Sequence, residues 1–137
     1  MERCNDVKRR FNECNVSNLL GITIDHVEEG LARGRMTVAK KHTNVFGGIH
    51  GGILFAFADQ VGGACGNSLE YKALLVESVA RFKKTAREGE VIYAEARLVH
   101  SRRQKDTIEI TVTNGREEVL ALLKMTSFIV DNAPKAP

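Results

Sequence analysis

The segment GGIHGGILFAFADQVGG, residues 47–63, decides the fold of this 137-residue sequence. It is strongly apolar and rich in glycine, yet it carries a histidine, His50, and an aspartate, Asp59. We expect a helix from about His50 to Leu69 that is apolar nearly all round and is therefore buried. A buried helix needs a cover, and the flanking sequence must supply it.

The flanking segments predict strands. Residues 21–27 and 34–39 alternate apolar and polar side chains and indicate a hairpin that turns at 28–30. Four further segments keep the period of two, at 74–86, 91–100, 107–113 and 119–130. The dipeptide Asn114-Gly115 favours a tight type I′ turn between the last two. We therefore expect an antiparallel meander of four strands, apolar on one face and covered there by the helix.

The first twenty residues predict an additional, covering helix. Asn5 or Asp6 can cap its start, and Val7, Phe11 and Cys14 form an apolar stripe along it. The whole chain, residues 1–137, then forms one α+β domain in which a sheet wraps around a long central helix.

Composition limits the function classes. The chain is 43% hydrophobic and 27% charged, and it contains no targeting segment or membrane-spanning apolar run, so we expect a cytoplasmic protein. A net charge of +3 with few aromatic residues argues against nucleic acid and favours a small anionic ligand. Three cysteines without CxxC spacing and four histidines without ligand spacing predict no metal site.

The glycines and Asp59 each allow two interpretations. If His50 or Gly51 opens the helix, the first free amides there can stabilise an anion or a carbonyl that gains negative charge; the glycines can equally form a simple tight turn. Asp59 is a candidate catalytic carboxylate, because burying an unpaired carboxylate is costly. Its structural alternatives are a cap at a helix break near Gly62-Gly63 or an ion pair with Arg81.

Spacing adds a constraint on assembly. Asp59 lies eight positions after Gly51, which is about 12 Å along a helix. If the Gly51 amide and the Asp59 carboxylate act on one carbonyl, they must come from different chains. That chemistry requires at least a homodimer.

The run NVFGGIHGG at 44–52, followed by Ala58-Asp59, resembles the hotdog acyl-CoA thioesterases of the PaaI-like, phenylacetate-pathway type. The similarity extends to residues 81–86 and 100–103. It implies a hotdog fold and hydrolysis of an acyl-CoA to a carboxylic acid and free CoA, without a cofactor. It makes the Gly51 amide and the Asn44 side chain the groups that polarise the thioester carbonyl. Asp59 of the partner chain becomes the general base or the nucleophile.

The resemblance implies further site residues. His50 holds the loop or touches the thioester, and Gly52 contacts the substrate. Phe46, Phe55 and Phe57 are candidates to line an aromatic or fatty acyl pocket, and they serve equally well as core residues. The CoA phosphates are expected to attract two basic groups that lie about 30 Å apart, at opposite ends of the sheet, within one chain. These are Arg81, Lys83 and Lys84, and Arg102 and Arg103. A homotetramer of two dimers is the assembly that the family favours.

One family feature is absent from the sequence. Some members of the family place a Ser or Thr near the start of the third strand, where it assists the water that attacks the thioester. This chain has Leu75 there, and Ser78 is the candidate substitute. Two other functions remain open. One is a non-catalytic hotdog domain that binds acyl-CoA; the other is a hotdog hydratase or dehydratase that uses His50 and Asp59 as an acid/base pair.

Overall fold

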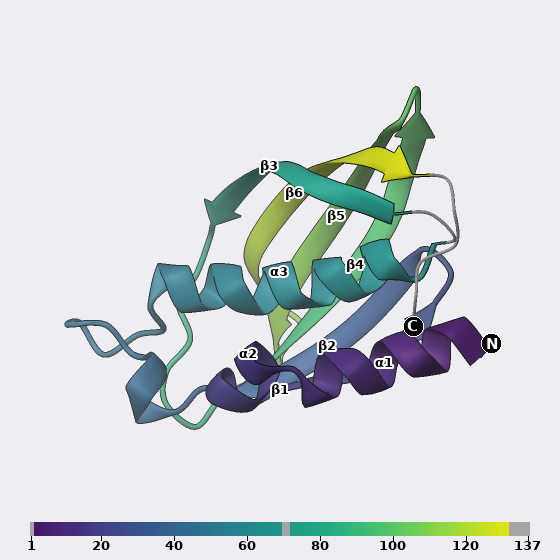
Figure 1. Ribbon diagram of the computed structural model, residues 1–137. Helices are drawn as coiled ribbons and strands as arrows, with labels where there is room; N and C mark the ends of the chain where they lie inside the picture. Colours follow the sequence, from purple (N-terminus) through teal and green to yellow (C-terminus); the bar gives the residue numbers. More distant parts are fainter. Residues whose placement is uncertain (1, 70–71, 132–137) are drawn as a thin grey trace.

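In the computed structural model, which describes residues 2–69 and 72–131, a six-stranded antiparallel sheet curves around one long helix (Figure 1). The predicted α+β architecture, the first hairpin and the central helix are confirmed. The elements are, in chain order, α1 (Glu2–Glu13), α2 (Asn15–Leu20), β1 (Ile22–Glu28), β2 (Leu31–Thr37), η1 (Lys40–His42), α3 (Gly51–Asn67), β3 (Lys72–Phe82), β4 (Val91–Arg102), β5 (Lys105–Asn114) and β6 (Val119–Asp131).

The sheet has the strand order β1-β2-β4-β5-β6-β3. The predicted four-strand meander is therefore wrong in one connection, because β3 pairs with β6 and β4 pairs with β2. Residues 83–90 carry the chain from the outer strand β3 back to the middle of the sheet. That link is held by backbone bonds from Lys83 to Leu120 and from Ile49 to Ala86. Period-two patterning identifies strands but does not specify which strands pair.

The concave face of the sheet packs against α3. The core side of the helix includes Leu54, Phe57 and Val61, each at most 2% exposed. Close approach is possible because Gly62 has no side chain: a Cβ there would collide with Met125 and lie 2.7 Å from Cδ1 of Ile110. The prediction of burial all round is wrong for the opposite side of α3, which stays partly exposed because the sheet covers only one face of the helix.

The tight turn occurs at a different hairpin from the one predicted. Arg103 and Gln104, between β4 and β5, have φ values of 51° and 65°, and two successive positive φ angles characterise a type I′ turn. After β5 the chain makes a longer loop, 115–118. There the Asn114 side chain accepts hydrogen bonds from the amides of Arg116 and Glu118. These bonds hold the wider loop, so Asn114-Gly115 does not form the predicted turn.

The N-terminal helix starts earlier than predicted. α1 begins at Glu2, so Asn5 and Asp6 lie inside it, and Asp6 forms an ion pair with Arg9 one turn later rather than capping the helix. The helix also breaks at Cys14, which divides the predicted stripe between α1 and α2.

α1 lies beside β1, one of the two edge strands (Figure 1). The Asn12 side chain donates to the carbonyl of Ile24 at 3.0 Å and accepts from its amide at 2.7 Å. The side-chain amide thus takes the place of a neighbouring strand at this position. No helix in the described part of the chain is long and apolar enough to cross a membrane.

Candidate active site

The glycine-rich loop ends at the start of α3, where His50 is the N-cap. Its Nδ1 accepts a hydrogen bond from the Gly52 amide at 2.9 Å, so the imidazole satisfies one of the free donors of the first turn. The carbonyl of buried His42 accepts from the His50 amide at 2.8 Å. Burial and nearby Lys41 lower the pKa of His42, whose neutral Nδ1 accepts from the Ala39 amide. These bonds fix the backbone immediately before Gly51.

The Gly51 amide has no hydrogen-bond partner among residues 2–69 and 72–131. Gly51 lines a cavity of about 370 Å³ together with Asn44, Phe82 and Lys83. The Oδ1 atom of Asn44 accepts from the Phe46 amide at 2.9 Å, and its Nδ2 has no partner in the described chain. Gly51 and Asn44, each with an N–H donor that has no partner in the described chain, therefore line one cavity, and polarisation of a carbonyl needs such donors.

Asp59 lies further along the same helix, on its partly exposed side. Burial raises the pKa of its carboxyl group. Neither structural alternative applies, because α3 continues unbroken to Asn67 and the described residues provide no ion pair or hydrogen bond to Asp59. An unpaired, half-buried carboxylate with a raised pKa is the kind of group that serves as a catalytic base or nucleophile.

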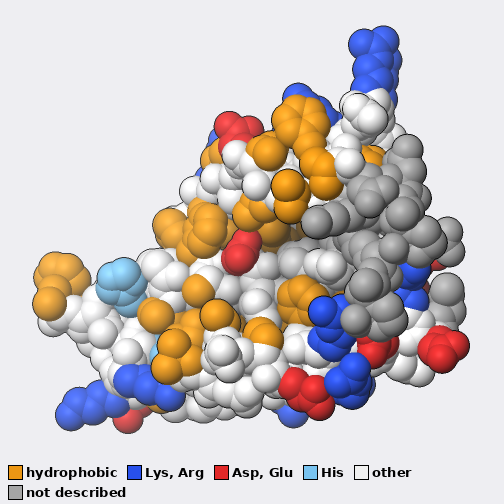
Figure 2. Space-filling view, viewed as in Figure 1, with side chains coloured by type: hydrophobic (Ala, Val, Ile, Leu, Met, Phe, Trp, Pro, Cys, Tyr) orange, Lys and Arg blue, Asp and Glu red, His pale blue; other side chains and the backbone are white. Residues whose placement is uncertain are grey.

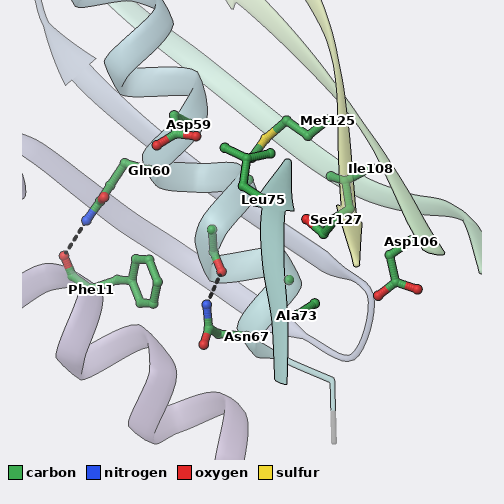
Figure 3. A pocket seen from close by; sticks show the side chains of 13 residues that line it. Phe11, Asp59, Gln60, Asn67, Ala73, Leu75, Asp106, Ile108, Met125 and Ser127 are labelled. Carbon is green, nitrogen blue, oxygen red and sulfur yellow. Dashed lines mark hydrogen bonds between the residues drawn. The ribbon is translucent and has the colours of Figure 1, made fainter. Parts of the chain in front are cut away.

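Asp59 faces a second cavity, of about 140 Å³, between α3 and strands β3, β5 and β6 (Figure 3). Figure 3 shows Asp59 and Gln60 on the helix side and Ser127 and Asp106 on the strand side. Gly51 belongs to the other cavity. Within one chain, Gly51 and Asp59 thus line separate cavities. The two residues are about 12 Å apart along the helix.

The basic residues also divide between two regions. Lys83 and Lys84 line the Gly51 cavity, whereas Arg81 does not. Lys84 forms an ion pair with Glu118, and this pair, with hydrogen bonds from Asn114 and Arg116, lowers the pKa of Glu118 to about 2. Lys84 is therefore already neutralised, and Lys83 is the cavity cation that keeps its charge available.

Arg102 and Arg103 lie at the opposite end of the sheet, as predicted. Along β6, Arg81 pairs opposite Leu122, while Lys105 at the β4–β5 turn pairs opposite Phe128. One chain alone does not bring the two basic groups together.

The remaining predicted site residues lie as follows. Phe46 is 85% exposed and lines neither of the two cavities. Gly52 is exposed, and its amide is used by His50. Leu75 does line the Asp59 cavity. A bulge after Leu75 turns Ser78 inward opposite Met125, where its Oγ is buried without a partner in the described chain.

Several residues that line the two cavities are not predicted from the sequence pattern. Phe82 lies 3.8 Å from where a Cβ on Gly51 would be, and Phe11 of α1 borders the Asp59 cavity. Asp106 was also missed, although the alternation of β5 contains the signal, because Asp106 shares the inward face of Ile108 and Ile110.

The sequence is similar to a family of known proteins and to individual known proteins. Residues 46–121 match the thioesterase superfamily. A putative esterase of Archaeoglobus fulgidus is 35% identical over 113 residues, covering 82% of this chain and 73% of the relative. The acyl-coenzyme A thioesterase PaaI of Escherichia coli is 30% identical over 105 residues, covering 77% and 75%.

Solved structures agree on the fold. The E. coli PaaI structure superposes with a TM-score of 0.90 at 24% identity and covers 96% of both chains. A Streptococcus mutans protein solved with bound acetyl-CoA gives a TM-score of 0.78 at 26% identity, covering 82% of this chain and 90% of that one.

Proposed function

The chain belongs to the thioesterase superfamily and has the PaaI-like hotdog fold, and from this membership we propose that it hydrolyses an acyl-CoA to a carboxylic acid and free CoA. The relatives identify a thioester hydrolase; the CoA part of the substrate is suggested by the name of E. coli PaaI and by the acetyl-CoA bound to the S. mutans protein. The proposal needs no cofactor. The described residues contain no group of three or more side chains that could hold a metal ion.

The observation that carries this proposal is the free carboxylate of Asp59 on a half-buried helix face. As a general base it takes a proton from water, whose oxygen attacks the thioester carbonyl, and the CoA thiolate leaves. As a nucleophile it attacks the carbonyl itself and expels the CoA thiolate, and water then hydrolyses the resulting mixed anhydride. Either route places negative charge on the carbonyl oxygen.

That negative charge would be stabilised by the Gly51 amide at the positive end of α3, with Nδ2 of Asn44 as a second donor. His50 is a positioning residue in this scheme, because its imidazole caps the turn from which the Gly51 amide projects.

We propose that the site forms between two chains, with Gly51 from one and Asp59 from the other. The separate cavities of Gly51 and Asp59 support this arrangement. So does the edge of β3, where Leu74, Val76 and Val79 are 51–53% exposed, whereas Asn12 covers the edge of β1. Figure 2 shows hydrophobic side chains gathered on the face that carries α3 and β3. A second copy pairing along β3 would cover them.

Antiparallel pairing of two β3 strands would also unite the basic groups. The β4–β5 turn lies near the start of β3, and Lys83 follows its end. In an antiparallel pair, the start of one strand meets the end of the other. Arg102 and Arg103 of one chain would then approach Arg81 and Lys83 of its partner, giving a combined site for the CoA phosphates. Following the family resemblance, we propose that two such dimers form a tetramer.

The test is release of free thiol from a panel of aromatic, short-chain and long-chain acyl-CoAs. We expect turnover by the unaltered protein and a loss of about a hundredfold or more in Asp59→Ala. Glu109→Gln, which removes an exposed carboxylate from β5, is the matched control and should keep full activity. Acyl-CoA binding without turnover would instead indicate a binding domain. Conversion of an enoyl-CoA or hydroxyacyl-CoA without thiol release would indicate a hydratase.

A further inference from the structure

One buried histidine has no part in the proposed chemistry. His42, the last residue of η1, is 2% exposed, and its Nε2 is buried without a hydrogen-bond partner among residues 2–69 and 72–131. Burying a polar group without a partner costs free energy, and a leucine of similar size would avoid that cost. The other ring nitrogen of His42 shows what offsets it.

That nitrogen, Nδ1, fixes the start of η1. It accepts a hydrogen bond from the Ala39 amide at 2.9 Å. Only a neutral imidazole with its proton on Nε2 can accept there, and burial, together with nearby Lys41, lowers the pKa of His42 and favours that form. Ala39 is a firm anchor, because the amide and the carbonyl of the neighbouring Val38 are both hydrogen-bonded to residues 89–90.

The main chain of His42 closes a loop with the start of α3. Its carbonyl accepts a hydrogen bond from the His50 amide at 2.8 Å. The next residue, Thr43, forms a β-bridge with Ile49. Residues 42–50 therefore form a loop with two paired legs, and the imidazole of His42 ties the base of that loop to the chain that leaves β2.

Both groups proposed to polarise the thioester carbonyl belong to this loop. Asn44 lies two residues after His42 on the first leg, and the Gly51 amide directly follows the second leg. A displacement of about 1 Å at a reacting group can cost about a hundredfold in rate. Loss of the bond between His42 and Ala39 would release the base of the loop, and with it both donors.

We propose that His42 is a positioning residue for the hydrolysis, whose imidazole holds the loop 42–50 so that both carbonyl-polarising donors act at one place. Because His42 is buried, it contacts neither the thioester nor the reacting atoms in this scheme. The inference rests on the proposed function, since it concerns how the donors of that site are held.

Two substitutions separate positioning from packing. His42→Leu fills the same space without a hydrogen-bond acceptor, and because it also removes the unpartnered Nε2 it should melt close to the temperature of the unaltered protein. His42→Asn can keep an acceptor, its Oδ1, near the place of Nδ1, but it leaves the remaining volume of the ring empty and should melt lower. Thermal unfolding measures both.

The rates of thiol release should follow the opposite order. In His42→Leu, kcat should fall by about tenfold or more with KM little changed, because the donors act on charge that develops in the transition state. His42→Asn should retain most of kcat. Met36→Leu, an apolar exchange at an equally buried site of β2, is the control and should keep kcat. Full kcat in His42→Leu, or rates that rank with the melting temperatures, would show that the side chain only fills space and would overturn the inference.

Hydrogen exchange of backbone amides tests the loop without a substrate. The His50 amide should exchange about tenfold faster or more in His42→Leu, whereas the Val38 amide, on the anchor side, should exchange at its unaltered rate. If no thioester is hydrolysed, the proposed function fails, but these exchange rates still decide whether His42 holds the loop. Unchanged exchange of the His50 amide in His42→Leu would overturn the inference.

Discussion

At the scale of single residues, Asp59 combines a functional benefit with a stability cost. Burial raises its pKa in the folded chain, so the ionised form is less favourable folded than unfolded. Its contribution to stability is therefore greatest below the unfolded pKa, about 3.9, and is lost as pH rises through the folded value. We expect Asp59→Asn to melt at a higher temperature than the unaltered protein at pH 7, with a difference that narrows on acidification.

Thermal unfolding of both proteins at several pH values between pH 4 and 8 measures this effect. A less stable Asp59→Asn protein, or a difference independent of pH, would contradict it. Hydrolysis should follow the same ionisation: because the ionised carboxylate is the active form, kcat/KM should decline as pH falls through the raised pKa.

His50 is predicted to act through its hydrogen bond to the Gly52 amide. His50→Ala should lower the free energy of unfolding by about 1 kcal/mol, while His50→Asn, which can still accept that bond, should recover most of the loss. Urea unfolding measures both. The rate of thiol release should be reduced in His50→Ala and largely restored in His50→Asn, in parallel with their free energies of unfolding. A His50→Asn protein of full stability that lost hydrolysis would show instead that the imidazole contacts the thioester.

At the scale of elements, the packing of α3 on the sheet depends on its glycines. A Cβ at Gly62 would collide with Met125 and Ile110, whereas one at Gly66 would meet Cδ1 of Ile108 at an ordinary 3.6 Å. Gly62→Ala should cost about 1–3 kcal/mol through overpacking. Gly66→Ala should gain up to about 1 kcal/mol from helix propensity. Denaturant titration of both variants distinguishes them, and equal effects would contradict this account of the packing.

At the scale of the whole molecule, activity should depend on the β3 edge. Val76→Lys/Val79→Lys adds two charges to that edge, and we expect monomers without hydrolysis, because each site loses one of its two contributing chains. Val16→Lys/Leu19→Lys adds the same charge to exposed positions of α2 and should leave the assembly unchanged. Light scattering after gel filtration gives the mass of each, including whether the unaltered protein is a tetramer. An active monomer would contradict the shared site.

Subunit mixing tests the shared site directly. Asp59→Ala and Asn44→Ala should each be nearly inactive alone. In an equal mixture, half of the dimers are hybrids with one intact site of two, so about a quarter of the activity should return. Hybrids of confirmed composition that stay inactive would place both groups in the same chain.

The sequence predicted where the helices and strands lie better than it predicted which strands pair. The alternation from residue 74 onward located the last four strands, but β3 pairs with β6 and not with β4, because the pairing depends on the path of residues 83–90. The glycine-rich segment identified α3, Gly51 and Asp59 because their chemistry is unusual for a buried helix. It did not reveal that Asp106 lines the same cavity as Asp59, because a cavity is a property of packing that no local pattern encodes.

The Asn12 bonds to Ile24 have a consequence for how large an assembly can grow. A sheet with two exposed edges can pair with a further copy at each edge. Such copies add to one another without limit, which is the route to fibres. Because the Asn12 side chain occupies the edge of β1, this molecule keeps one edge, that of β3, for pairing with another copy. In the proposed dimer, joining two copies along β3 would use both free edges, so the sheet would end at twelve strands and strand addition would not propagate into a polymer.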